Sequence, residues 1–238
     1  MDEIIFFFVV VAKMPKEGFS KTRLAKDLHY GDSEKLYDAF IKDFFLNYSK
    51  KVKGLEKIFG RLNLFITPKS EGPKNYFKKI LEPLFLQDTQ IDFQSERPFF
   101  LRLKDIFERM KIQNGNHFIH LTGTDIPDFP FKLIENYFSL SKGKDDVIIG
   151  PDEDGGFYYI GMEAKNSSVF EIEEGIKRGR ESVLTLILKR CRQLGLRVKV
   201  LEKWSDIDNL NDLNKCLNRS HRNVIPNTYE LSVRMGII

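Results

Sequence analysis

The opening stretch, residues 4–12, constrains the fold more than any other part of the sequence. All of its residues are apolar, and most are β-branched or aromatic. A strand with one solvated face would alternate apolar and polar residues, whereas a strand buried on both faces reads as a continuous apolar run. The chain therefore begins with a central strand of a largely parallel sheet, which needs helices on both of its faces.

The rest of the chain alternates strand-like and helix-like segments. Apolar stretches bounded by Gly or Pro predict strands at residues 61–67, 116–125, 146–150, 157–162 and 196–201. Apolar positions at helical spacing predict helices from an N-cap at Ser33 to about Tyr48, and at residues 75–85, 100–110, 130–141, 182–194 and 210–217. Residues 87–97 fit either a short strand or a polar loop. The order predicts an α/β fold: a mostly parallel sheet flanked by helices in three layers.

Length and composition fit one domain. The chain has 238 residues, and its hydrophobic fraction of 42% is enough for a substantial core. We place the domain at residues 1–220 and expect residues 221–238, which lack a clear pattern, to be a tail that docks on it. A net charge of +4 is too modest to indicate a nucleic-acid partner. Residues 4–12 are too short to span a bilayer and follow two acids rather than cations, so we expect a cytoplasmic protein.

Basic residues crowd the loop after the first strand. Five cations stand there against the single acid Glu17: Lys13, Lys16, Lys21, Arg23 and Lys26. Such cations can bind phosphate oxygens, since Arg offers a bidentate donor and Lys a point charge. A P-loop is excluded because Pro15 and Ser20 stand where its glycines are needed. A solvated basic loop is the other interpretation, and the residues alone leave both open.

Asp125 ends the predicted strand at residues 116–125, and Pro127 blocks any continuation of that strand. Open α/β sheets bind their ligands at the carboxyl ends of strands. A carboxylate at that edge is a candidate ligand for Mg²⁺ or Mn²⁺. Asp125 fits equally well as the cap of a turn or helix.

Two acidic stretches follow. In residues 150–161, three acids precede Gly155-Gly156, whose glycines permit a positive φ and a close approach to a ligand. A hairpin turn at Asp154-Gly155 would explain part of this pattern. After the last predicted strand, Asp206 and Asp208 offer a second metal ligand, with Asp208 preferred. The alternative for that pair is an acid-rich helix N-terminus, which the helix dipole favours.

Four motifs occur in one order along the chain: Ala12-Lys13-x-Pro15-x-x-Gly18-x-x-Lys21-Thr22-Arg23-Leu24, Gly123-Thr124-Asp125-Ile126-Pro127, Gly150-Pro151-x-x-Asp154-Gly155-Gly156-Phe157-Tyr158-x-Ile160-Gly161 and Asp206-Ile207-Asp208-x-x-x-Asp212-Leu213. Together they resemble the nucleotide-diphospho-sugar transferase superfamily, which has the GT-A fold, over roughly residues 4–217. Within it the chain is most similar to the selenodomain-associated glycosyltransferase-like branch, and more distantly to phospholactate and molybdenum-cofactor guanylyltransferases. It departs from that branch at residues 179–182, where members often carry Trp-Ser-Thr, and at Asn209, where they have Thr.

The resemblance implies roles for residues at matching positions. It implies that the nucleotide is bound by Ala12, Lys13, Pro15, Gly18, Lys21, Arg23, Gly123 and Thr124. It implies that Asp125, completed by Asp206 or Asp208, holds Mg²⁺ or Mn²⁺. It implies that the sugar or acceptor is faced by Asp154, Gly155, Gly156 and Phe157. Asp125, Asp154 and Lys21 would then carry catalysis.

The function that the resemblance implies is metal-dependent transfer from a nucleotide sugar to a small-molecule acceptor. A nucleotidyltransferase, guanylyl or cytidylyl, that acts on a small phosphorylated metabolite and releases pyrophosphate is the alternative, which the Lys-x-Arg pattern of the basic loop favours. A nucleotide-binding module without catalytic activity is a further alternative. The base, the acceptor and the oligomeric state lie outside what the sequence indicates.

Overall fold

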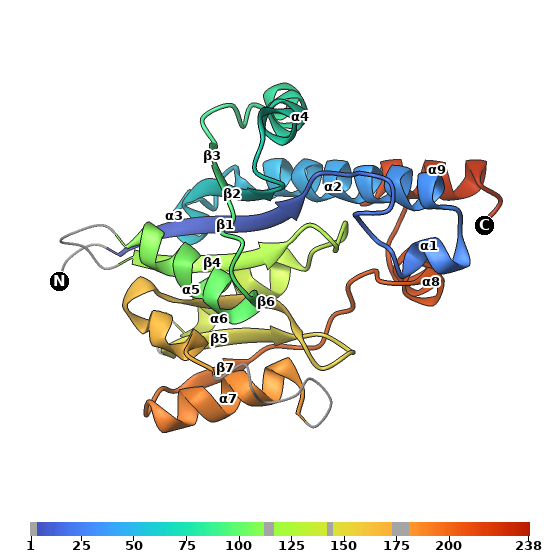
Figure 1. Cartoon of the computed structure of the whole chain (residues 1–238). Helices are drawn as coiled ribbons and strands as arrows, with labels where there is room; N and C mark the ends of the chain where they lie inside the picture. Colours follow the sequence, from blue (N-terminus) through green and yellow to red (C-terminus); the bar gives the residue numbers. More distant parts are fainter. Residues whose placement is uncertain (1–3, 112–116, 142–144, 173–180) are drawn as a thin grey trace.

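A seven-stranded sheet forms the centre of the computed structural model, which describes residues 4–111, 117–141, 145–172 and 181–238 (Figure 1). Its strands are β1 (Ile5–Lys13), β2 (Arg61–Thr67), β3 (Gln90–Phe93), β4 (His117–Gly123), β5 (Val147–Pro151), β6 (Phe157–Glu163) and β7 (Val198–Val200). The predicted strands all form, with β2 at its predicted bounds. The ambiguous residues 87–97 contain the edge strand β3. Asn116, the predicted start of the fourth strand, lies outside the described residues.

The strand order is β3-β2-β1-β4-β6-β5-β7. Neighbouring strands run parallel except at β6, which is antiparallel to both β4 and β5. A mixed sheet of this kind arises because β5 and β6 are joined by a short hairpin, which can connect only antiparallel strands. The fold is thus α/β with a mostly parallel sheet, GT-A-like, as predicted.

The strand β1 lies at the middle of the sheet, between β2 and β4. Phe8 and Val10 pack on one face against the helices described below as α2 and α6, while Phe7 and Val9 pack on the other face against α5. Their side chains are at most 7% exposed. The continuous apolar run at residues 4–12 therefore reflects burial on both faces.

The helices are α1 (Leu24–Asp27), α2 (Tyr30–Val52), α3 (Glu56–Phe59), α4 (Glu71–Leu81), α5 (Phe99–Met110), α6 (Phe131–Ser141), α7 (Val183–Gln193), α8 (Leu210–Arg219) and α9 (Pro226–Arg234), with 3₁₀ segments η1 (Glu82–Leu84) and η2 (Ala164–Phe170). Residues of α2, α4, α6 and α8 join the core on one face of the sheet, and those of α5, η2 and α7 the core on the other. None of the helices in the described ranges has the length and apolar character of a membrane span.

Two predicted helix starts are wrong. The helix α2 begins at Tyr30 with His29 as its N-cap, and the Ser33 hydroxyl lies inside the first turn, where it donates to the Tyr30 carbonyl at 2.8 Å. The helix α4 begins four residues before the predicted Asn75. Gly72 and Pro73 read as breakers in the sequence, but Pro is compatible with a first turn, whose N–H groups have no partner inside the helix.

The helix α9 forms within the residues predicted as a tail and packs on α2. The Asp43 carboxylate of α2, which is fully buried, accepts hydrogen bonds from the backbone N–H groups of Asn227 at 3.0 Å and Thr228 at 2.8 Å. A side chain from another helix thus caps the first turn of α9, whose own N-cap residue, Ile225, has no capping side chain. The boundary near residue 220 stays a proposal.

Replacing Asp43 by Ala should lower the free energy of unfolding by about 2 kcal/mol, because two buried backbone donors lose their partner. Urea unfolding followed by circular dichroism measures this. The control is Asp32→Ala, which removes an exposed ion pair with Lys35 from the same helix and should cost about 0.5 kcal/mol. Equal losses in the two variants would contradict the capping role.

Candidate functional site

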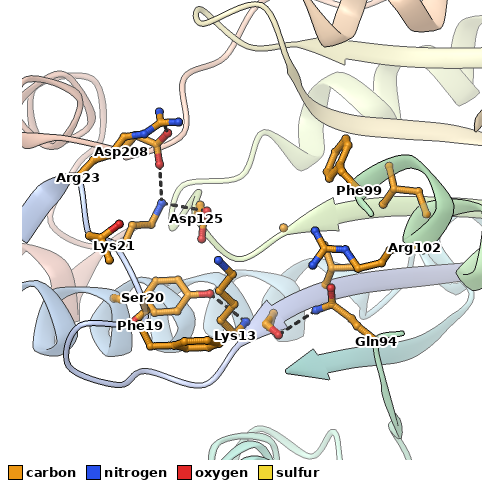
Figure 2. A pocket seen from close by; sticks show the side chains of 16 residues that line it. Lys13, Phe19, Ser20, Lys21, Arg23, Gln94, Phe99, Arg102, Asp125 and Asp208 are labelled. Atoms are coloured by element: carbon orange, nitrogen blue, oxygen red, sulfur yellow. Dashed lines mark hydrogen bonds and ion pairs between the residues drawn. The ribbon is translucent and has the colours of Figure 1, made fainter. Parts of the chain in front are cut away.

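A cavity of about 430 Å³ opens at the carboxyl ends of β1 and β4 (Figure 2). Its lining comes from the end of β1, the basic loop at residues 13–26, the α2 residue Tyr37, the segment from Gln94 to Leu103, and the acids Asp125 and Asp208. Open α/β folds bind their ligands at these carboxyl ends of the strands. The volume lies within the range of about 300–1,000 Å³ typical of small-molecule sites.

Three carboxylates converge at one side of this cavity. Asp125 follows β4, and Asp206 and Asp208 lie in the loop between β7 and α8. One oxygen from each of the three lies within 4.8 Å of the others, an arrangement that could hold a metal ion. We call Asp125, Asp206 and Asp208 the acidic triad. Residues far apart in the sequence thus supply hard oxygen ligands of the kind that Mg²⁺ and Mn²⁺ prefer.

The ammonium of Lys21 lies against the acidic triad. Its Nζ is 2.9 Å from Oδ2 of Asp125 and 3.2 Å from Oδ1 of Asp208, and the side chain is 4% exposed. Figure 2 shows Lys21 pointing between these two carboxylates, which lie on different segments of the chain. Arg23 binds the other oxygen of Asp208 at 2.6 Å. Two of the cations predicted to bind phosphate therefore contact carboxylates in this structure.

Burial and charge set the protonation of these groups. Burial alone would lower the pKa of Lys21, but the charges of Asp125, Asp208 and Asp206 outweigh it, so the pKa lies above its usual value and the ammonium stays charged. Burial raises the pKa of the Asp206 carboxyl to about 7; Lys21 opposes the shift, and Asp208 and Asp125 add to it. In the absence of a metal, Asp206 is thus protonated over much of the acidic range.

The loop that carries Asp206 and Asp208 is tied to the strand that positions Asp125. The backbone N–H of Ile207 donates to the Asp125 carbonyl at 3.0 Å. Arg219 of α8 donates to both oxygens of the buried Asp128, at 2.6 and 2.9 Å, and to the Ser205 carbonyl at 2.7 Å. One guanidinium therefore links the loop after β4 to the residue preceding Asp206.

The sequence left two roles open for Asp206 and Asp208: metal ligands, or acidic residues at a helix N-terminus. In the structure a different residue caps the helix that follows them. Asn209 is the N-cap of α8: its side chain accepts from the Asp212 N–H, and Asp212 accepts from the Asn209 N–H. This capping box leaves one oxygen of Asp208 on Lys21 and the other on Arg23. Asn209, a departure from the family pattern, therefore has a structural function here.

The basic loop is a tight turn. Gly18 has a φ of +70°, and the Ser20 hydroxyl both accepts from the Lys16 N–H and donates to the Lys16 carbonyl, each at 3.1 Å. Ala12 and Pro15 are buried, whereas the side chains of the remaining cations of the loop, Lys13, Lys16 and Lys26, are exposed. Lys13 lines the cavity, with its Nζ over the Phe19 ring.

The acidic glycine stretch at residues 150–161 does not line the cavity, and each of its acids has a partner. Asp152 accepts from the Gly156 N–H at 2.6 Å, Glu153 pairs with Lys215, and Asp154 lies 4.0 Å from Arg23. Gly155 has a φ of +85°, as a positive φ was expected. The close contacts that require these glycines are with protein: added Cβ atoms would come within 2.8 Å of Ser182 and 2.4 Å of Asp152.

Ser182 and Phe157 lie next to the glycine pair Gly155-Gly156. Ser182 is the N-cap of α7, whereas Gly179 and Arg180 of the departure from the family pattern lie outside the described residues. Phe157 lies against Phe99, which lines the cavity, with ring centroids 6.4 Å apart. The chain thus places the predicted acceptor residues around the hairpin between β5 and β6.

Several cavity residues were not predicted. The Tyr37 hydroxyl of α2 is 2.9 Å from the Thr124 hydroxyl and accepts from the Lys13 N–H, so it joins three of the segments around the cavity. Gln94 donates to the carbonyls of Ala12 and Phe65 and fixes the carboxyl ends of β1 and β2. Tyr37 reads in the sequence as an ordinary core position, and Gln94 lies in the stretch that was ambiguous.

Comparison with known proteins gives the chain its family. Residues 55–174 match the family of uncharacterized proteins conserved in bacteria, DUF2064. The chain belongs to this family. No curated protein matches its sequence.

Solved structures share the fold of this DUF2064 protein. A "putative nucleotide-diphospho-sugar transferase" from Desulfovibrio desulfuricans is 26% identical, with 98% of this chain and 96% of that one covered and a TM-score of 0.75. A cytidylyltransferase from Leptospira borgpetersenii is 14% identical, with 99% and 97% covered and a TM-score of 0.53. A 4-diphosphocytidyl-2C-methyl-D-erythritol synthase from Anaerococcus prevotii is 12% identical, with 90% and 97% covered and a TM-score of 0.52. The nucleotide-diphospho-sugar transferase fold is therefore established.

The raised pKa of Asp206 predicts a stability difference that depends on pH. Its folded-state pKa of about 7 exceeds the ordinary value of 3.8, so the metal-free protein loses stability as the pH rises from about 4 to 7. Asp206→Asn removes the buried charge, and at pH 8 without metal it should be about 1–2 kcal/mol more stable than the wild type. At pH 5, where Asp206 is protonated in the folded protein but largely ionised in the unfolded chain, the gain should be smaller than at pH 8, and it should vanish only below about pH 4.

Urea unfolding in EDTA at the two pH values measures the effect. Asp208→Asn is the control, because it loses contacts with Lys21 and Arg23 and should be destabilised at both pH values. A gain for Asp206→Asn that is the same at pH 5 and pH 8, or a loss at pH 8, would contradict the burial of an unfavourable charge.

Proposed function

We propose that this DUF2064 protein is a metal-dependent transferase that uses a nucleotide sugar. The observation that carries the proposal is the acidic triad beside Lys21 and Arg23 at the edge of a cavity. Carboxylates for a divalent metal and cations for phosphate oxygens then lie within one site, as transfer from a nucleotide sugar requires.

The donor set fits a divalent metal. The ligands are carboxylate oxygens, which suit Mg²⁺ or Mn²⁺, and the Lys21 ammonium already shows that a cation is stabilised among them. Asp125, Asp206 and Asp208 would hold the ion. A metal bound there would act as a Lewis acid that neutralises charge developing on the leaving diphosphate.

The protein residues would supply binding, orientation and further charge. Lys21, Arg23 and Lys13 bind the phosphates in this proposal, because they line the cavity next to the acidic triad. Asp154 and the glycine pair at the β5–β6 hairpin face the sugar or acceptor. Catalysis would rest mainly on electrostatic stabilisation and positioning.

The comparisons support the glycosyl assignment. The Desulfovibrio protein covers almost the whole chain, and its name is that of a nucleotide-diphospho-sugar transferase. The resemblance of the sequence motifs to the selenodomain-associated glycosyltransferase-like branch of that superfamily supports it as well.

Nucleotidyl transfer with release of pyrophosphate is the second candidate. The positive charge of the cavity favours this reaction. Four cationic side chains line the cavity and would match the charge of a triphosphate: Lys13, Lys21, Arg23 and Arg102. The product separates the two reactions: glycosyl transfer releases a nucleoside diphosphate, whereas nucleotidyl transfer releases pyrophosphate.

Asp125→Ala should abolish the metal-dependent stabilisation of the protein by nucleotides and lower turnover by about 10²-fold or more, because it removes one ligand of the metal site. Thermal shift with Mg²⁺ or Mn²⁺ against a panel of nucleotide sugars and nucleoside triphosphates gives the first readout. Assays for the release of nucleoside diphosphate and of pyrophosphate, on the nucleotides that bind, give the second. The control is Asp105→Ala, which removes an ion pair on the surface of α5.

If Asp125→Ala keeps the metal-dependent thermal shift of the wild type, the acidic triad is not the metal site. If no nucleotide in the panel stabilises the wild type, the proposal that the protein uses a nucleotide is wrong. Stabilisation without any turnover would favour a nucleotide-binding module.

A further inference from the structure

The Lys21 ammonium lies buried against the acidic triad. It contacts two carboxylates of the acidic triad, at 2.9 and 3.2 Å, from a side chain that is 4% exposed. The backbone of Lys21 has a φ of +49°, a left-handed conformation that a non-glycine residue adopts at some cost. The fold therefore directs this ammonium to the place where a metal would bind.

A divalent metal at the acidic triad would need the oxygens that Lys21 now contacts. Arg23 already pairs with Oδ2 of Asp208. The oxygen of Asp208 that remains for a metal is therefore Oδ1, which Lys21 now contacts. A magnesium ion lies about 2.0–2.1 Å from each ligand oxygen. An ammonium that stayed 3 Å from the same oxygens would be pressed against a dication of like charge, so one of the two cations must leave.

We propose that Lys21 is the internal counter-ion of the acidic triad and that a metal ion displaces it. The displaced ammonium moves into the adjoining cavity, where the phosphates of the nucleotide receive it. Metal and nucleotide binding are then coupled through Lys21, since each makes the other more favourable. This inference rests on the proposed function, because it requires that the acidic triad bind a metal.

The surroundings of Lys21 favour such a movement. Its side chain lines the cavity, and within the described residues its ion-pair partners are Asp125 and Asp208 alone. Once a metal neutralises the acidic triad, no other acid in the described residues forms an ion pair with the ammonium. A flexible four-carbon stem can carry it from the carboxylates to a phosphate without movement of the backbone.

The test measures Mn²⁺ binding alone by electron paramagnetic resonance, in the full chain and without nucleotide. Lys21→Met removes the competing cation and should tighten the dissociation constant of Mn²⁺ by about tenfold or more relative to the wild type. Lys16→Met removes an equal charge from an exposed position of the same loop and gives the background effect of net charge. Lys21→Arg keeps the competing charge and should not tighten binding.

A second readout uses the wild type and avoids any change of stability. Acetic anhydride labels accessible lysines, and mass spectrometry reports each site. Saturating Mg²⁺ should increase the labelling of Lys21 severalfold, because it leaves its buried ion pairs, whereas the exposed Lys16 should be labelled equally with and without metal.

The outcomes separate the inference from the proposed function. If the wild type binds Mn²⁺ and Asp125→Ala does not, but Lys21→Met binds no more tightly than Lys16→Met, the metal site stands and the displacement of Lys21 is overturned. Lys21 labelling that stays constant or falls in Mg²⁺ overturns it as well. If neither the wild type nor Lys21→Met binds Mn²⁺, both the metal site and the inference fail.

Discussion

The balance of charge between one buried ammonium and three carboxylates is the interaction on which this site depends. Asp125, Asp206 and Asp208 come from two distant parts of the chain, and bringing them together without a cation would cost more than most single contacts contribute. Lys21 supplies that cation, and the burial of its side chain keeps the interaction strong. Burial raises the pKa of the third carboxyl, Asp206, to about 7, and Lys21 offsets this shift only in part because Asp208 and Asp125 add to it.

The fold brings these groups together through its strand order. The strand β4 lies next to β1, so the residues after both strands meet at one edge of the sheet. The late loop reaches the same edge from β7 through a hydrogen bond of Ile207 to the Asp125 carbonyl and through Arg219, which is bound to Asp128 and Ser205. In Figure 1 the connection from β7 to α8 crosses the end of the sheet for this reason.

Patterns of local origin were readable from the sequence, and contacts of tertiary origin were not. The strands β1 and β2 could be predicted from their apolar residues, because the burial of a strand determines which of its positions are apolar. The helix α9 depended on a partner elsewhere, because its cap is Asp43, 184 residues away. The convergence of Asp125 with Asp206 and Asp208 was an expectation from strand ends and resemblance. The contact of Lys21 with that triad, and the parts played by Tyr37 and Gln94, required the structure.

Anomalous diffraction from manganese, measured on crystals of the wild type soaked with Mn²⁺ and a non-hydrolysable nucleotide sugar, locates the metal relative to the acidic triad and Lys21. We expect a single strong anomalous peak bounded by Asp125, Asp206 and Asp208, with Lys21 turned toward the phosphates. A manganese peak elsewhere on the protein, with the acidic triad still paired to Lys21, would contradict this expectation.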